Sequence, residues 1–113
     1  MSINSNQLVE LLESTGYEVY LGEAAKNQAY PYIVYSFVGE DDKKASSKIF
    51  KTLPYYQVAL FTEGDREDLN QIKKVFNDDR VPFKPFQSLS YKENNKQITN
   101  FYTYVRCLED GQE

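Results

Sequence analysis

The side chains that most often perform catalysis are scarce in this sequence. It has no histidine, which removes the commonest general base and the commonest metal ligand. Its single cysteine, Cys107, cannot form an intramolecular disulfide or a thiolate cage for a metal ion. No serine stands in a nucleophile-elbow sequence, and the five glycines are too scattered for a phosphate-binding loop. We therefore expect a protein that is not an enzyme and that uses no cofactor and no metal.

Pairs of acidic residues are present, but their spacing does not favour a reaction centre. The pairs are Asp41-Asp42, Glu67-Asp68 and Asp78-Asp79. Acid–base or metal chemistry needs two carboxylates that converge from separate elements at a concave site. Neighbours in a single loop or helix end do not provide that arrangement. We interpret all three pairs as solvated surface acids.

Tyrosine is the unusual component of the composition. Ten tyrosines and seven phenylalanines make the chain 15% aromatic, without any tryptophan. Tyrosine is enriched at protein–protein interfaces, where its ring is buried and its hydroxyl stays paired. The alternatives are half-buried strand residues that cover a small sheet, or a stacking platform for single-stranded nucleic acid. Eight tyrosines lie in or beside expected strands: Tyr30, Tyr32, Tyr35, Tyr55, Tyr56, Tyr91, Tyr102 and Tyr104.

The charge balance does not favour a nucleic-acid reader. Lysine and arginine total 13 and acidic residues 17, for a formal charge of −4. Three of the acids, Glu109, Asp110 and Glu113, lie in the last five residues, so the rest of the chain is almost neutral. No apolar run approaches the roughly 18 residues of a membrane span, and the first residues do not resemble a secretory signal. We expect a soluble protein found in the cytoplasm and no contact with a membrane.

The hydrophobic pattern predicts two helices and five strands. Leu8, Leu11 and Leu12 recur at helical spacing, with Asn4 or Ser5 as the N-cap and Gly16 after the helix. Asp65 is a suitable N-cap for the second helix. The expected elements are a helix at 5–15, strands at 17–21 and 32–38, a strand that begins at about 49 and runs through 55–62, a helix at about 65–76, and strands at 86–92 and 97–108.

The most polar stretch, residues 39–48, has no hydrophobic period, so we expect it to form a mobile loop. It contains five candidate interaction residues: Glu40, Asp41, Asp42, Lys43 and Lys44. Pro54 follows the loop and is expected to interrupt the next strand or to mark a bulge. A polar loop of this kind could become ordered on contact with a neighbouring molecule.

The order of elements, α-β-β-β-α-β-β, predicts an α+β fold with a mostly antiparallel sheet of about five strands. At 113 residues the chain is expected to be one domain, with an ordered body at about 5–108 and a short acidic tail at 109–113. Two short helices would most simply share one sheet face. The tyrosines would then occupy the other face, and we expect a partner or further copies of the chain to cover it.

The whole pattern resembles the tail completion proteins of long-tailed bacteriophages and prophages of Gram-positive bacteria, also called tail terminator or head–tail joining proteins. The resemblance rests on the following segments: Leu8-Val9-Glu10-Leu11-Leu12, Gly16-Tyr17-Glu18-Val19-Tyr20, Pro31-Tyr32-Ile33-Val34-Tyr35, Asp41-Asp42-Lys43, Val58-Ala59-Leu60-Phe61-Thr62, the helix around Leu69 to Phe76, Tyr91-Lys92-Glu93 and Phe101-Tyr102-Thr103-Tyr104. It spans roughly residues 5 to 108.

The resemblance implies a structural protein of the virion. Such a protein caps the head-proximal end of the tail tube as a ring, commonly a hexamer, and presents a docking surface to the head–tail connector. DNA passes through the lumen without being read, and assembly takes place in the host cytoplasm. The interaction residues that we nominate are Glu40, Asp41, Asp42, Lys43, Lys44, Tyr30, Tyr32, Tyr55, Tyr102 and Tyr104. The alternative is a small cytoplasmic ligand-binding or regulatory domain whose site is the tyrosine face.

Overall fold

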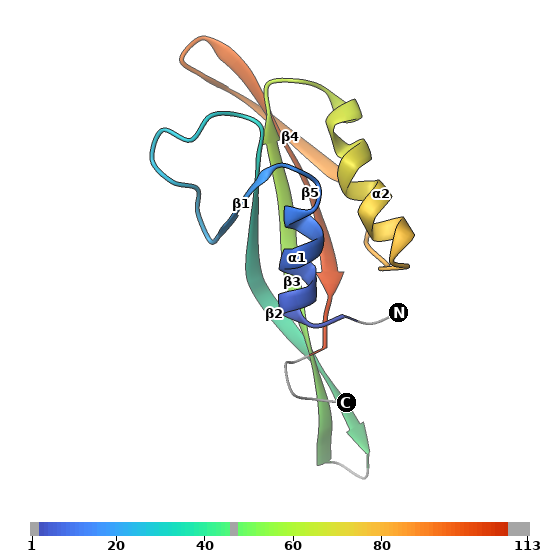
Figure 1. Cartoon of the computed structure of the whole chain (residues 1–113). Coiled ribbons are helices and arrows are strands. Elements are labelled where there is room, and N and C mark those ends of the chain that lie inside the picture. The colour runs from blue at the N-terminus through green and yellow to red at the C-terminus, as the bar shows by residue number, and fades with distance from the viewer. Residues whose placement is uncertain (1–2, 46–47, 109–113) are drawn as a thin grey trace.

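The computed structural model describes residues 3–45 and 48–108 (Figure 1). Among these residues the first element is helix α1 (Ser5–Glu13) and the last is strand β5 (Lys96–Arg106). In chain order the other elements are β1 (Glu18–Leu21), β2 (Tyr32–Ala45), β3 (Lys48–Thr62), the 3-10 helix η1 (Arg66–Leu69), α2 (Asn70–Asp78) and β4 (Gln87–Glu93). This order confirms the predicted succession of helices and strands.

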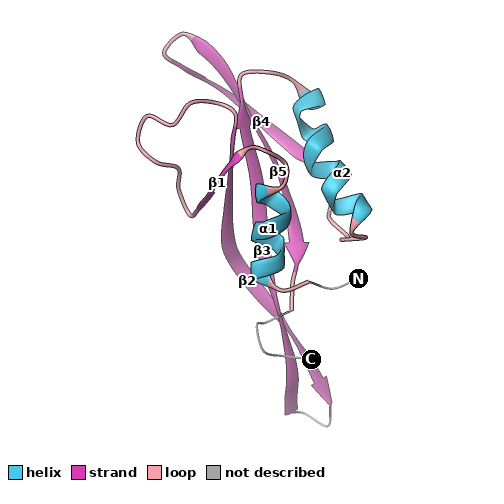
Figure 2. Ribbon diagram, in the orientation of Figure 1, coloured by secondary structure: helices cyan, strands magenta, loops and turns pink. Residues whose placement is uncertain are grey.

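The five strands form one sheet in the order β1-β2-β3-β5-β4. Strands β1 and β2 are parallel, whereas the β2–β3, β3–β5 and β4–β5 pairs are antiparallel. The α+β fold with a mostly antiparallel sheet is therefore confirmed (Figure 2). Strands β1 and β4 lie at the two opposite edges of this sheet.

Local capping interactions explain where α1 begins and ends. The Asn4 side chain accepts a hydrogen bond from the Gln7 N–H at 2.8 Å, and the Gln7 side chain accepts one from the Asn4 N–H at 2.9 Å. This capping box satisfies backbone donors that the first helical turn leaves free. Gly16 follows the helix with a φ of 92°, a left-handed conformation that glycine adopts without a steric penalty.

The second helical segment also begins at its predicted cap. The Asp65 carboxylate accepts a hydrogen bond from the Glu67 N–H at 2.9 Å, and η1 leads directly into α2. Thr62, the last residue of β3, donates from its hydroxyl to the Asp68 carboxylate at 2.5 Å. The Tyr17 hydroxyl donates to the Asp68 carbonyl at 2.8 Å. These bonds join η1 to the end of β3 and to the segment after α1.

Both helices pack on one face of the sheet (Figure 1). Leu8 and Leu12 from α1 and Ile72 and Phe76 from α2 are fully buried. The strands contribute alternate residues to the same core, because successive side chains point to opposite faces of a sheet. The buried strand residues of this core are Ile33, Val58, Leu60 and Val105, joined by Cys107 just after β5.

The prediction of a loop over residues 39–48 is wrong. Strand β2 continues to Ala45 and β3 begins at Lys48, so the two strands form a long hairpin (Figure 1). We call its distal part, residues 39–45 and 48–54, the arm. Residues 46–47 at its tip, and the tail 109–113, lie outside the described residues.

The arm departs from a regular ladder near its base. Pro54 lies inside β3 and does not end it. The bulge lies on the facing strand, where Phe37 pairs with Tyr56 and Gly39 pairs with Tyr55, which leaves Val38 as the extra residue. Backbone pairing with β3, and not a hydrophobic period, therefore defines this part of β2.

Candidate interaction surfaces

The sheet face opposite the helices carries most of the nominated tyrosines. Cross-strand pairs place Tyr32 opposite Phe61, Gln57 opposite Tyr104, and Tyr55 opposite Arg106. These side chains alternate with the core residues along the same strands. We call this surface the open face, made of Tyr20, Tyr32, Tyr55, Gln57, Phe61, Tyr102, Tyr104 and Arg106. The expectation that tyrosines gather there is correct for Tyr32, Tyr55, Tyr102 and Tyr104, whereas Tyr35 and Tyr56 pack against the helix-side core.

Four aromatic rings form a cluster at one end of the open face. The Tyr32 ring stacks on Phe61 at 5.2 Å and on Tyr30 at 5.3 Å between ring centroids. The Tyr20 ring meets Tyr32 edge-on at 6.2 Å. The Tyr30 hydroxyl donates to the Glu93 carboxylate at 2.7 Å, which joins the segment before β2 to the end of β4.

Two phenols of this cluster, Tyr30 and Tyr32, are held in their neutral form. Burial, and then the hydrogen bond to Glu93, raise the pKa of Tyr30 well above its ordinary value. Burial, with nearby Tyr91 and Glu93, also raises the pKa of Tyr32. Neutral phenols are poor nucleophiles, so the cluster can stack and donate hydrogen bonds but is not suited to covalent chemistry.

A second group lies where the arm leaves the body. The Arg106 guanidinium forms an ion pair with the Asp41 carboxylate at 2.7 Å and donates a hydrogen bond to the Tyr55 hydroxyl. The Tyr55 hydroxyl in turn donates to Asp41 at 2.6 Å, and the guanidinium lies 4.7 Å from the Tyr55 ring centroid. The hydrogen bond to Tyr55 raises the pKa of Arg106, so the cation is permanent. This triad joins β2, β3 and β5 across the base of the arm.

The last two nominated tyrosines form a pair on β5. The Tyr102 and Tyr104 rings meet edge-on at 6.3 Å. The Tyr102 hydroxyl donates to the Gln87 side chain at 3.3 Å, and the Gln57 amide donates to the Tyr104 hydroxyl at 3.4 Å. These long bonds hold the phenols weakly and leave them able to bond to a partner.

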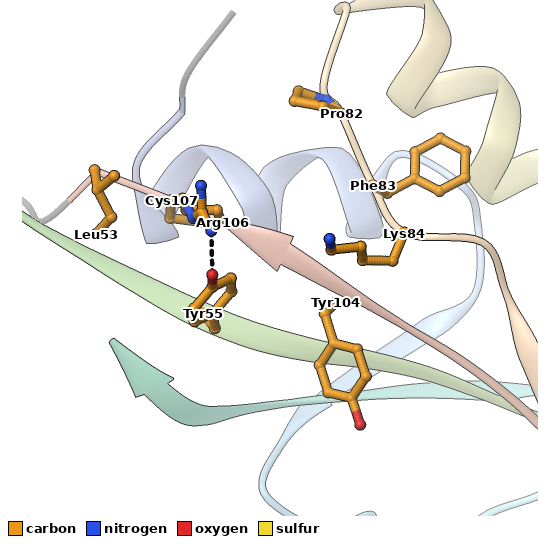
Figure 3. Close-up of a pocket in the computed structure, with 8 residues that line it drawn as sticks. All are labelled: Leu53, Tyr55, Pro82, Phe83, Lys84, Tyr104, Arg106 and Cys107. Atoms are coloured by element: carbon orange, nitrogen blue, oxygen red, sulfur yellow. Dashed lines mark hydrogen bonds between the residues drawn. The ribbon is translucent and has the colours of Figure 1, made fainter. Parts of the chain in front are cut away.

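A hollow of about 430 Å³ lies beside the triad, between β5 and the segment that leads into β4 (Figure 3). Two cationic side chains, Lys84 and Arg106, line it with aromatic and aliphatic residues. Figure 3 shows the Lys84 side chain extending from its segment in the direction of Arg106. The remaining lining residues are Leu53, Tyr55, Pro82, Phe83, Tyr104 and Cys107. Such a hollow could accept an anionic group with an apolar body.

The nominated residues therefore fall into separate places and not into one site. Asp41 and Tyr55 meet at the triad, Tyr30 and Tyr32 belong to the aromatic cluster, and the Tyr102–Tyr104 pair lies between them along the sheet. Glu40 is exposed on the arm. The backbones of Asp42, Lys43 and Lys44 belong to β2, and their side chains lie outside the described part of the structure.

Sequence reasoning missed two contributors, Arg106 and Lys84. Arg106 follows Tyr102 and Tyr104 at a spacing of two, which indicates that the three share a face but does not indicate the acidic partner of Arg106. Lys84 stands between Pro82 and Pro85 in a segment without any period, and only folding brings it beside β5. Its backbone N–H donates to the Tyr104 carbonyl at 3.2 Å.

Across residues 3–45 and 48–108, no three metal-ligating side chains gather in one place. None of the helices in the described chain is long and apolar enough to cross a bilayer. No protein-family model and no curated protein matches this sequence. The functional interpretation therefore depends on the surfaces described above.

Proposed function

We propose that this chain is a tail completion protein of a long-tailed bacteriophage. In this role it is a structural protein of the virion that forms an oligomeric ring, commonly a hexamer in such proteins, at the head-proximal end of the tail tube. It joins the tube to the head–tail connector. Host cytoplasm is the place of assembly, and DNA passes through the ring.

The observation that supports this proposal most is the arm. The molecule measures 56 × 25 × 23 Å, and the arm extends along the long axis beyond both helices (Figure 1). A two-stranded hairpin by itself is marginally stable in water. An arm that projects from the helix-covered body is therefore suited to packing against another molecule.

The open face and the charge of the body are consistent with the same role. Rings of Tyr32, Phe61, Tyr102 and Tyr104 lie on a face that neither helix covers. Contact with neighbouring copies would bury this aromatic surface, as interfaces enriched in tyrosine do. An almost neutral body would let DNA slide through a lumen, whereas a basic one would hold phosphates.

Native mass spectrometry and co-purification test the proposal. The purified chain is measured alone, and then with the tail-tube and connector proteins encoded by the same phage genome. We expect a closed oligomer in at least one setting, bound to the tube or to the connector. Absence of a closed oligomer in every setting, together with absence of binding to either protein, would overturn the proposal.

The hollow beside Lys84 favours a second candidate, a ligand-binding domain. Its volume of about 430 Å³ is within the usual range for sites of small organic ligands, and Lys84 and Arg106 would favour a carboxylate. A thermal-shift screen with small aromatic and aliphatic carboxylates distinguishes the two functions. Stabilisation by a carboxylate that is lost in Lys84→Ala, without any binding to tail proteins, would favour this second candidate.

A further inference from the structure

The outer edge of β2 is open along the arm. Strand β1 pairs with β2 only from Tyr32 to Tyr35, and the last bond on that side joins the Gly22 N–H to the Tyr35 carbonyl at 2.9 Å. Within the described residues, no strand pairs with this edge from Ser36 to Ala45. Phe37 and Val38, at the start of the open stretch, are 54% and 51% exposed. An open edge of this length is a template for another strand.

The direction of the backbone groups on this edge follows from the ladder on the other side. The Cys107 N–H donates to the Pro54 carbonyl at 2.8 Å, so Pro54 faces β5. Its neighbours Leu53 and Tyr55 then face β2, and their partners Asp41 and Gly39 face β3. Glu40, between those two, turns its N–H and carbonyl outward. The second register shift places its extra residue, Phe50, on β3, so β2 stays regular from Gly39 to Ala45.

The opposite edge of the sheet is also open. Within residues 3–45 and 48–108, strand β4 pairs with β5 alone, and all seven of its residues are exposed. The turn at Asn94–Asn95 has positive φ at both residues, 52° and 66°, and its flanking pair is Glu93 with Lys96. In a two-residue hairpin of this type the flanking pair is hydrogen-bonded, so Glu93 faces β5. Lys92 therefore turns its backbone groups outward.

These two edges match each other in length, in the outward direction of their backbone groups, and in the opposite charges of one pair of residues. The regular part of β2, from Gly39 to Ala45, has seven residues, and so does β4. Antiparallel pairing of the two segments over their full length sets Glu40 opposite Lys92. Both of these residues turn their backbone groups outward, as a hydrogen-bonded pair requires. Their side chains are exposed, and no ion pair joins either to a residue that the structure describes.

We propose that the outer edge of β2 in the arm receives β4 of a second copy of this chain, antiparallel, with Glu40 facing Lys92 of that copy. The contact joins opposite edges of consecutive copies, which is a head-to-tail interface of the kind that closes into rings. Opposite charges facing each other across strands favour this register over its neighbours. This inference rests on the proposed ring, for which it supplies the contact between subunits.

The triad at the base of the arm supports the geometry. The Asp41–Arg106 ion pair and the bonds to Tyr55 hold β2, β3 and β5 together immediately beside Glu40. The receiving edge is therefore attached to the body before any partner arrives. An edge that is ordered in advance loses less conformational entropy when it accepts a strand.

A charge exchange tests the contact. Glu40→Lys and Lys92→Glu each place like charges opposite one another and should weaken association by about tenfold in native mass spectrometry. The double variant restores opposite charges and should recover the wild-type oligomer. So should an equal mixture of the two single variants, because every contact in an alternating ring is then again a pair of opposite charges. Glu10→Lys and Lys73→Glu make the same changes of net charge on exposed helix positions and should leave assembly unchanged.

Disulfide trapping gives an independent measurement that does not depend on affinity. Hydrogen-bonded antiparallel partners have Cα atoms about 5.5 Å apart, which a disulfide can span. Under mild oxidant, the double variant with Glu40→Cys and Lys92→Cys should give a ladder of covalent oligomers, alone or with tail-tube protein. Either single variant should not cross-link to itself. Cross-linking of Glu40→Cys alone would show that two β2 edges pair with each other and would overturn the proposal.

The outcomes of these experiments distinguish an error in the proposed contact from an error in the proposed function. If the chain binds the tail tube or the connector while the charge exchange has no effect and no ladder forms, the proposed contact is wrong and the function stands. If the ladder forms and the double variant recovers assembly but no tail protein binds, the contact stands and the tail function is wrong. Failure of both the ladder and the charge exchange overturns the contact in either case.

Discussion

At the scale of single residues, the contacts that matter most on the open face join strands that are far apart in the sequence. Arg106 reaches Asp41 across β3, and Tyr55 contributes both a hydroxyl and a ring to the same cation. The charged groups are 43% and 44% exposed, so water and salt screen the ion pair. The triad therefore sets the direction in which the arm leaves the body, and it contributes less to the stability of the fold.

Replacing Asp41 with asparagine should lower the free energy of unfolding by about 0.5 to 1 kcal/mol after allowance for screening, because the amide would keep the shape of the carboxylate but lose the charge opposite Arg106. Urea denaturation at low and high salt measures this, and the difference should shrink as salt increases. The control is Asp78→Asn, which removes the more exposed pair with Lys74 and should give a smaller change. Equal effects of the two variants would contradict the role given to the triad.

At the scale of elements, the helices and the arm differ in what holds them. Leu8, Leu12, Ile72 and Phe76 attach the helices to a common core. The arm is held by its ladder and by the triad at its base. We therefore expect its distal part, residues 42–52, to be removable without loss of the core.

An arm-shortened variant tests this separation. Residues 42–52 are replaced by Asn-Gly, which closes a two-residue turn on the pair Asp41 and Leu53. We expect a melting temperature close to that of the full chain and a loss of oligomers, since the receiving edge is gone. The radius of gyration, 15.3 Å in the full chain, should approach the roughly 13 Å of a compact domain of this size in small-angle scattering of the monomer.

The matched control for this variant is Asn95→Gly, which changes a turn but leaves both sheet edges in place. It should keep the assembly of the full chain. An arm-shortened chain that fails to fold would show that the arm contributes to the core, contrary to the separation described above.

At the scale of the whole molecule, half-buried phenols link stability to alkaline pH. Burial raises the pKa of Tyr17, Tyr30, Tyr32 and Tyr35 above the ordinary value of 10.0. The folded state therefore keeps phenolic protons that the unfolded state releases above pH 10. The resulting stabilisation is complete below pH 10 and is lost as the pH rises through the higher pKa values of the folded protein.

We therefore expect the free energy of unfolding to fall as the pH rises above 10.0, with tyrosinate absorbance appearing together with unfolding. Chemical denaturation at pH values on both sides of 10 measures this dependence. Tyr30→Phe removes one of these phenols and should make the decline shallower. A decline of the same steepness in Tyr30→Phe would show that Tyr30 is not one of the linked groups.

Much of the local structure could be predicted from the sequence. The cap at Asn4, the left-handed Gly16, the cap at Asp65 and the turn at Asn94–Asn95 each depend on residues only a few positions apart. The faces of β5 also followed from alternation, with Thr103 and Val105 buried. The α+β class then followed from the order of these elements.

The arm is the main element that the sequence did not predict, and the reason is physical. A charged run such as Glu40 to Lys44 has no hydrophobic period, and period is the signal from which strands are predicted. Here the strand is held by backbone bonds to residues of β3, and composition does not report such bonds. The triad could not be predicted for the same reason, because Asp41 and Arg106 lie on strands that a third strand separates.

The sequence by itself thus determined the elements and the surplus of tyrosine, because capping, turns and alternation are interactions between near neighbours. Only the tertiary structure decided which tyrosines stay on the open face, that the polar segment becomes an arm, and that the sheet ends in two open edges of matching length. Those features arise from strand order and register. Backbone pairing between distant segments sets both, and no local pattern encodes it.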